Sequence, residues 1–167
     1  EVMMRGTFAN IRIKNEMAPG TEGGFTKLYP EEKVMPVFSA VEEYKKRGTA
    51  LVVIGGKEYG TGSSRDWAAK GTKLLGVKVV IAESFERIHR SNLIGMGVLP
   101  LQFTEGNNRT NLNLIGSELI TILDIQEGVN PSDYVQVEIK YASGDIKKIK
   151  TLCRIDTKNE LEYYKNG

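Results

Sequence analysis

Short apolar runs alternate with longer amphipathic segments in the middle of the chain. The apolar runs are residues 51–54, 77–82 and 98–103, and each is rich in Val, Ile or Leu. The first run is continuous, which is typical of a strand that is covered on both faces. Pro100 indicates that the last strand lies at a sheet edge or ends nearby. We expect all three runs to be β-strands.

The first amphipathic segment follows the glycine-rich residues 60–66. It places Trp67, Gly71 and Leu74 on one helical face, and Gly76 can end the helix. The sequence therefore predicts a strand, a tight loop and a helix in succession.

A second helix is predicted before the third strand. Ser84 is placed to cap it, and Phe85, His89 and Leu93 would share its apolar face. Gly97 can end it. The resulting order of strand, helix, strand, helix and strand predicts a small parallel sheet flanked by helices.

The C-terminal part of the chain has a different pattern. Apolar and polar residues alternate in residues 118–125, 134–141 and 146–155, and residues 143–145 are Ser-Gly-Asp, a hairpin-type turn. We expect additional antiparallel strands here. Residues 159–165 are expected to form a short terminal helix or a frayed tail.

The N-terminal part carries weaker signals. Residues 26–28 and 33–35 are expected to be short β-strands, and residues 37–46 have the apolar stripe of a helix. The predicted fold class is α/β, with a small parallel sheet flanked by helices and additional antiparallel strands. At this length, residues 1–167 are expected to form one domain.

The charge balance and hydropathy restrict the possible partners. The chain has 23 Lys and Arg residues against 21 Asp and Glu residues, a net charge of +2. This near balance argues against strong non-specific binding of nucleic acid. No apolar stretch approaches the roughly 20 residues of a membrane span, and no secretory signal is recognisable. We expect no membrane association and a cytoplasmic location.

Metal-ligating residues are scarce. Cys153 is the one cysteine and His89 the one histidine. A single cysteine cannot hold an iron–sulfur cluster or a structural zinc ion, so no metal site and no cofactor are predicted within this chain. Cys153 and His89 are both expected to be buried structural residues.

The glycine-rich residues 60–66 are the main candidate for chemistry. They place Ser63 and Ser64 at a helix N-terminus, beside Arg65. Unpaired backbone N–H groups and a guanidinium suit a carboxylate or phosphate. The alternative is structural: Ser63 with Asp66 resembles a weak capping box, and Arg65 would be a surface residue. Both interpretations stay open on this evidence.

Three common motifs do not fit these residues. A dinucleotide fingerprint needs a third glycine where Arg65 stands. Residues 55–57 lack the remaining positions of a phosphate-binding P-loop. A Ser-His-Asp hydrolase is a weak alternative, because the Gly-x-Ser-x-Gly pattern is absent.

Three segments carry sequence motifs that are more specific for a protein family than their apolar periodicity is. Residues 5–12, 56–71 and 82–101 closely resemble the C-terminal swivel domain of aconitate hydratases. The form is that of the bacterial A-type and cytosolic enzymes, which include the iron regulatory proteins. The mitochondrial type usually has Glu-His where this chain has Asp66-Trp67. The resemblance implies a swivelling β/β/α domain that is part of a longer enzyme.

The resemblance also implies residue roles. Ser63 would be the base that removes the carbon-bound proton of the substrate. Ser64 and Arg65 would bind substrate carboxylates, and Arg5 would be a further substrate ligand. The substrates would be citrate, isocitrate and cis-aconitate.

The family reaction also needs groups from outside this domain. A 4Fe–4S cluster, held by three cysteines of the N-terminal aconitase domains, acts on the leaving hydroxyl. The resemblance therefore implies that those domains are partners and that this chain is inactive alone. One alternative is an RNA-binding fragment of an iron regulatory protein. Another is the small subunit of a related hydro-lyase such as isopropylmalate isomerase.

Overall fold

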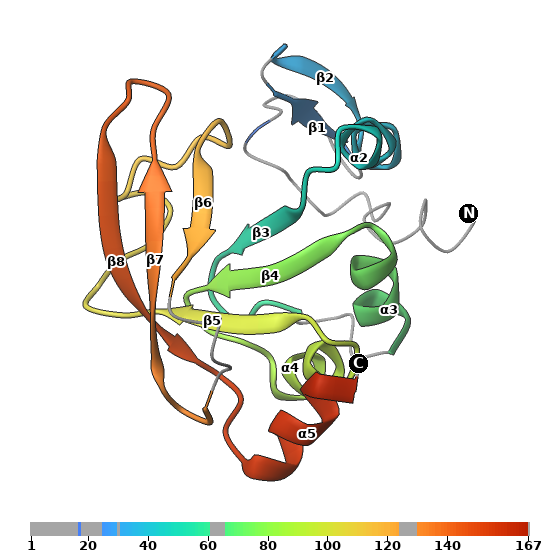
Figure 1. Ribbon diagram of the computed structural model, residues 1–167, viewed down its shortest axis with the longest axis vertical. Helices are drawn as coiled ribbons and strands as arrows, with labels where there is room; N and C mark the ends of the chain where they lie inside the picture. Colours follow the sequence, from blue (N-terminus) through green and yellow to red (C-terminus); the bar gives the residue numbers. More distant parts are fainter. Residues whose placement is uncertain (1–16, 18–24, 30, 61–65, 124–129, 167) are drawn as a thin grey trace.

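The computed structural model describes residues 17, 25–29, 31–60, 66–123 and 130–166. Its main feature is a six-stranded sheet in the order β3-β4-β5-β8-β7-β6. Strands β6, β7 and β8 run across the direction of β3, β4 and β5 (Figure 1). The strands are β3 (Leu51–Gly55), β4 (Val77–Ala82), β5 (Leu99–Phe103), β6 (Leu119–Ile122), β7 (Tyr134–Lys140) and β8 (Ile146–Cys153).

Strands β3, β4 and β5 are parallel, which confirms the predicted parallel sheet. Within it, β4 is buried on both faces. Val79 and Ile81 enter a large apolar cluster with residues of β5, β7 and β8, whereas Val80 enters a small cluster with Leu93 and Val98. The predicted cover on both faces of residues 51–54 is present: Val52 and Ile54 pack against the large cluster, and Leu51 and Val53 pack against the small one. The strand is nevertheless only half-buried, because β3 lies at the edge of the sheet.

Pro100 lies in the interior of the sheet, not at its edge. It pairs with Val80 on one side, and β5 has β8 as its other neighbour. The ladder to β8 runs from Leu101 to Phe103, and the Pro100 carbonyl accepts a hydrogen bond from the Arg154 amide at 2.9 Å. The missing N–H is tolerated because Pro100 precedes the first paired residue of that ladder.

Strands β6, β7 and β8 are antiparallel, as predicted. The Tyr141 amide donates to the Asp145 carbonyl at 2.8 Å, and the Gly144 amide donates to the Tyr141 carbonyl at 2.9 Å. Gly144 has a φ of +94°, a conformation that other residues rarely adopt. The Ser-Gly-Asp turn of residues 143–145 is thereby confirmed.

Helices α3 (Asp66–Leu74), α4 (Arg87–Gly95) and α5 (Lys158–Asn166) complete this part of the chain. Helix α3 packs against β4 and α4, whereas α4 also packs against β5 and α5. The terminal segment is therefore a docked helix, and Leu161 is buried in the large cluster. Helix α2 (Val37–Lys46) packs against the small antiparallel sheet of β1 (Phe25–Leu28) and β2 (Lys33–Pro36).

The described helices include none that is long and apolar enough to cross a membrane.

Candidate functional site

The carboxyl ends of β3 and β4 lie side by side. Gly55 pairs with Ala82 at the end of the parallel ladder, and the Glu83 amide donates to the Gly56 carbonyl at 3.1 Å. In open α/β sheets, ligands bind outside the carboxyl ends of the strands. This end of the sheet is therefore the candidate site, and the two segments that leave it are residues 56–60 and 83–89.

Residues 56–60, which we call the loop entry, are hydrogen-bonded to the segment after β4. The Tyr59 amide donates to the Ser84 carbonyl at 2.9 Å, and the Glu86 amide donates to the Tyr59 carbonyl at 2.9 Å. The Glu58 amide donates to Ser84 Oγ at 2.7 Å. Glu58 has a φ of +49°, so its backbone is in a region that costs energy for a residue with a side chain. These contacts hold that conformation.

The side chain of Tyr59, a residue of the loop entry, packs against two other rings. It meets Phe85 at a centroid distance of 6.2 Å and His89 at 5.4 Å, both edge to face. A Cβ at Gly55 would lie 2.6 Å from Tyr59 Cδ2, so the close approach of the ring requires glycine there. Burial raises the pKa of Tyr59 to about 12. The phenol therefore stays protonated near neutral pH and is no candidate for a general base.

Gly60 is in direct contact with His89. Its φ is +96°, and a Cβ built on it would overlap Cβ and Cγ of His89 and lie 2.5 Å from Cδ2. His89 itself is only 3% exposed. The imidazole therefore occupies the space in which any other residue at position 60 would place its side chain.

Glu86, and not Ser84, caps α4. Its carboxylate accepts hydrogen bonds from the Ile88 amide at 3.1 Å and the His89 amide at 2.8 Å. The His89 and Ile88 amides lower the pKa of this carboxyl. The prediction of a Ser84 cap was wrong, because the Ser84 hydroxyl accepts from the Glu58 amide and the helix begins at Arg87.

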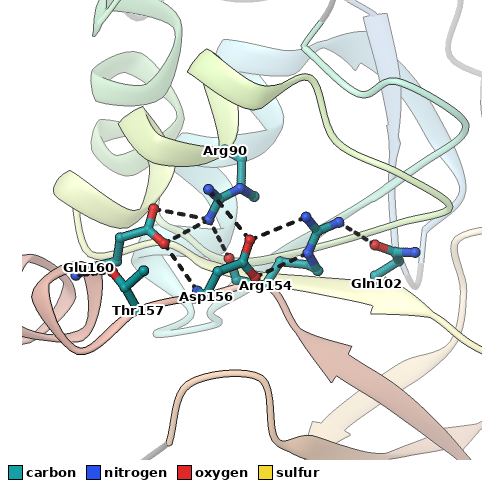
Figure 2. A network of polar contacts seen from close by, with 6 residues as sticks. All are labelled: Arg90, Gln102, Arg154, Asp156, Thr157 and Glu160. Atoms are coloured by element: carbon teal, nitrogen blue, oxygen red, sulfur yellow. Dashed lines mark hydrogen bonds and ion pairs between the residues drawn. The ribbon is translucent and has the colours of Figure 1, made fainter.

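On its other side, α4 is joined to α5 by charged residues (Figure 2). Arg90 is 8% exposed, and its guanidinium contacts Glu160 at 3.1 Å and Asp156 at 3.6 Å. It also donates to the Arg154 carbonyl at 2.6 Å. The Arg154 side chain in turn bonds to Gln102 of β5 and to Asp156. We call Arg90, Arg154, Asp156 and Glu160 the α4–α5 ion-pair cluster.

The residues to which the sequence assigned chemistry are Arg5, Ser63, Ser64 and Arg65. All four lie outside the described residues. The described chain reaches Gly60 at the end of the loop entry and resumes at Asp66, the first residue of α3. The structure thus describes both segments that flank residues 61–65 and leaves the four assignments as predictions.

The two residues expected to be structural are buried. Cys153 is fully buried in β8, where it pairs with Leu101, and burial raises the pKa of its thiol. A raised pKa disfavours the thiolate, which is the form that binds metal. The described residues contain no group of three or more His, Cys, Asp or Glu side chains arranged for a metal ion. A 4Fe–4S cluster does not fit a chain with this single, buried cysteine.

Comparison with known families decides the classification. Residues 1–106 match the family described as the aconitase C-terminal domain. The chain belongs to this family.

Full-length relatives extend the likeness over the whole chain. Over 167 residues this aconitase C-terminal domain is 65% identical to aconitate hydratase A of Legionella pneumophila and covers 19% of that protein. It is 58% identical to the aconitate hydratase A of Staphylococcus aureus and 59% identical to that of Staphylococcus epidermidis, covering 18% of each. The chain therefore spans about a fifth of the length of these curated relatives.

One solved structure is similar in part. It is a 3-isopropylmalate dehydratase from Methanocaldococcus jannaschii, with 24% identity and a TM-score of 0.46. The match covers 77% of this chain and 67% of that one.

Sequence reasoning missed the residues of this aconitase C-terminal domain that hold the site in place. His89 was expected to be a buried structural residue, which is confirmed, but its contact with Gly60 was not predicted. The ion pair of Arg90 with Glu160 joins residues 70 positions apart, and no local pattern indicates it. No residue-type signal marked Glu86 as the cap, because glutamate is not among the favoured N-cap residues.

Proposed function

We propose that this chain is the C-terminal domain of an aconitate hydratase that interconverts citrate and isocitrate through cis-aconitate. The observation that carries the proposal is the 65% identity to aconitate hydratase A in an alignment that covers all 167 residues of the chain. The loop entry supports it, because it leads to residues 61–65 from the carboxyl ends of parallel strands, where ligands bind in such sheets.

In this proposal Ser63 is the catalytic base, and Ser64, Arg65 and Arg5 bind substrate carboxylates. Tricarboxylic substrates suit paired arginines, since each guanidinium can hold a carboxylate through two charge-assisted hydrogen bonds. A serine hydroxyl is a poor base unless donors and positive charge stabilise its alkoxide. Arg65 and the amide groups at the start of α3, which begins at Asp66, are the nearest such groups along the chain.

The domain would supply only part of the active site. The described residues and the single cysteine do not fit an iron–sulfur cluster, so the 4Fe–4S cluster of the family would be bound by the N-terminal aconitase domains. The domain is then inactive alone. Residues 1–167 act as one domain in this proposal, and the cytoplasmic location stays a prediction that cell fractionation would test.

The decisive experiment uses the full-length protein and follows cis-aconitate by its ultraviolet absorbance. Ser63→Ala should lower kcat about 100- to 10,000-fold, the usual contribution of a positioned base, with a smaller change in KM. Arg65→Lys should raise KM, because it keeps the charge and loses the bidentate fork. Ser91→Ala, at an exposed serine of α4, is the control and should match the wild type.

Two results would contradict the proposal. Wild-type kinetics in Ser63→Ala would remove the base assignment, and turnover by the purified 167-residue chain would refute its inactivity alone. The two alternatives are weaker. The whole-chain identity to aconitate hydratases disfavours a separate small subunit, and the near-neutral charge disfavours autonomous RNA binding, which a gel-shift titration at physiological salt would test.

A further inference from the structure

We propose that His89 is a positioning residue for the proposed reaction. Its imidazole fixes the backbone at Gly60, and therefore the point from which the chain enters residues 61–65. The inference rests on the proposed function, in which Ser63 lies three residues beyond Gly60 and must meet the substrate carbon at a defined distance.

The contact between Gly60 and His89 leaves little freedom at position 60. The imidazole lies where a side chain of residue 60 would start, so only glycine can occupy the position. Gly60 also adopts a φ of +96°. Glycine is the most flexible residue, and an isolated glycine at a loop start would vary its direction widely. Packing against a buried ring removes that variation.

His89 can act in this way because its own position is well defined. Its amide is held by the Glu86 carboxylate at 2.8 Å, and its ring packs edge to face on Tyr59. The next residue, Arg90, is buried and contacts Glu160 of α5, Asp156 just before that helix and the Arg154 carbonyl. Helix α4 is therefore tied on one side to the loop entry and on the other side to α5.

The rest of the loop entry adds to the same restraint. The Glu58 amide donates to Ser84 Oγ, and the Tyr59 backbone is hydrogen-bonded to Ser84 and Glu86, the residues on either side of Phe85. All of these partners lie between β4 and the first turn of α4. A displacement of the imidazole would thus change the direction of the chain at Gly60 and loosen the backbone hydrogen bonds at Tyr59, whose ring packs on the imidazole. Misplacement of a reacting group by about 1 Å can cost on the order of 100-fold in rate.

The first test compares His89→Ala with Ile94→Ala in the full-length protein. Ile94 is an equally buried residue of α4, but it packs in the large cluster, away from Tyr59. His89→Ala should lower kcat/KM by about 10- to 100-fold in folded protein. Ile94→Ala, or the milder Ile94→Val if it does not fold, should reduce stability and leave kcat/KM unchanged. Equal losses of kcat/KM in both variants would show that His89 contributes only general packing, and would overturn the proposal.

The second test is a double-mutant cycle with Gly60→Ala. The partner substitution in the cycle is His89→Gly, because Cβ of His89 would overlap a side chain at position 60 as well as the ring does. If His89 is what excludes that side chain, the double variant should be no worse in kcat/KM than the worse single variant. Fold-losses that multiply would show that the two residues act independently and would overturn the proposal.

A third measurement does not depend on activity. In His89→Ala, hydrogen exchange at the Glu58 and Tyr59 amides should be about tenfold faster than in wild type and in the Ile94 variant. Unchanged exchange would contradict the restraint itself. A wild-type protein that lacks aconitase activity but shows this exchange pattern would refute the proposed function and leave the restraint of Gly60 by His89 standing.

Discussion

Two neighbouring residues of α4 serve two regions that are held together by different physical means. His89 faces the loop entry, where Gly60 fits against a buried ring and the other contacts are ring packing and hydrogen bonds of backbone amides. Arg90 faces α5, where charged side chains meet a buried guanidinium (Figure 2).

The difference determines what each region tolerates. Close packing has a steep repulsive limit, so the loop entry should be sensitive to a single added methyl group and insensitive to salt. Ion pairs depend on charge more than on shape, so the α4–α5 ion-pair cluster should respond to charge removal and to salt. The region nearer the proposed chemistry is the one held by shape, which suits a site whose geometry must be exact to a fraction of an ångström.

The largest effect on stability is expected at the loop entry. Gly60→Ala should destabilise the protein by about 3 to 4 kcal/mol, because the new methyl group overlaps His89 and the positive φ is strained. Gly48→Ala is the matched control. Gly48 has a φ of +70° but nothing within 4 Å of its built Cβ, so the strain alone should cost about 1 kcal/mol. Urea denaturation of the purified chain measures both, and equal losses would mean that the His89 contact contributes nothing.

A smaller effect is expected in the ion-pair cluster. Arg90→Met should cost about 2 to 3 kcal/mol, because it leaves Glu160, whose side chain is 18% exposed, without its cation. Asp156→Asn should cost about 1 kcal/mol or less, since the Asp156 side chain is 38% exposed.

Salt sharpens the contrast between the two regions. The stability difference between wild type and Arg90→Met should shrink modestly as the salt concentration rises, because a mostly buried pair is screened less than an exposed one, whereas the difference for Gly60→Ala should stay constant. A salt-independent effect of Arg90→Met would indicate that its packing, and not its charge, joins α4 to α5.

The smallest effect is expected from the Glu86 cap. Hydrogen bonds from the His89 and Ile88 amides lower the pKa of Glu86 below its ordinary value of 4.5. A lowered folded-state pKa stabilises the fold above pH 4.5, and this contribution is lost as the pH falls through the folded-state pKa. In urea denaturation between pH 3 and 6, about the range in which this carboxyl titrates, Glu86→Gln should weaken the acid-side loss of stability. An unchanged pH profile would show that the Glu86 carboxylate makes no measurable contribution to the pH dependence of stability.

The elements that the sequence predicted well are those with a strong local pattern. Residues 37–46 have a clear apolar stripe, and the observed helix is Val37–Lys46. The antiparallel strands and the turn at residues 143–145 follow from alternation and from a glycine at the position that needs positive φ. The family of the chain was also identified from the sequence, because residues 56–71 and 82–101 carry family-specific motifs. The match to the aconitase C-terminal domain family confirms this identification.

The errors have a common cause. The sheet edge offered for Pro100 was wrong and the half-burial of residues 51–54 was not foreseen, because a run of side chains does not reveal the order of strands in a sheet. The alternative for Pro100, a position near an end, agrees with its place just before the ladder to β8. Serine is a favoured N-cap residue and glutamate is not, so residue type pointed to Ser84. Only the nearby Glu58 amide, which donates to the Ser84 hydroxyl, and the start of the helix at Arg87 show that Glu86 is the cap. The assignments of Ser63, Ser64, Arg65 and Arg5 stay predictions, since these residues lie outside the described ones.

By itself, the sequence determined the local elements, the α/β class and the family, because apolar periodicity, turn residues and sequence motifs are properties of short segments. Only the tertiary structure decided that His89 lies against Gly60 and that Arg90 meets Glu160. The physical reason is that these contacts join residues 29 and 70 positions apart, and they exist only after the sheet has brought the ends of β3 and β4 together and α5 has docked on α4.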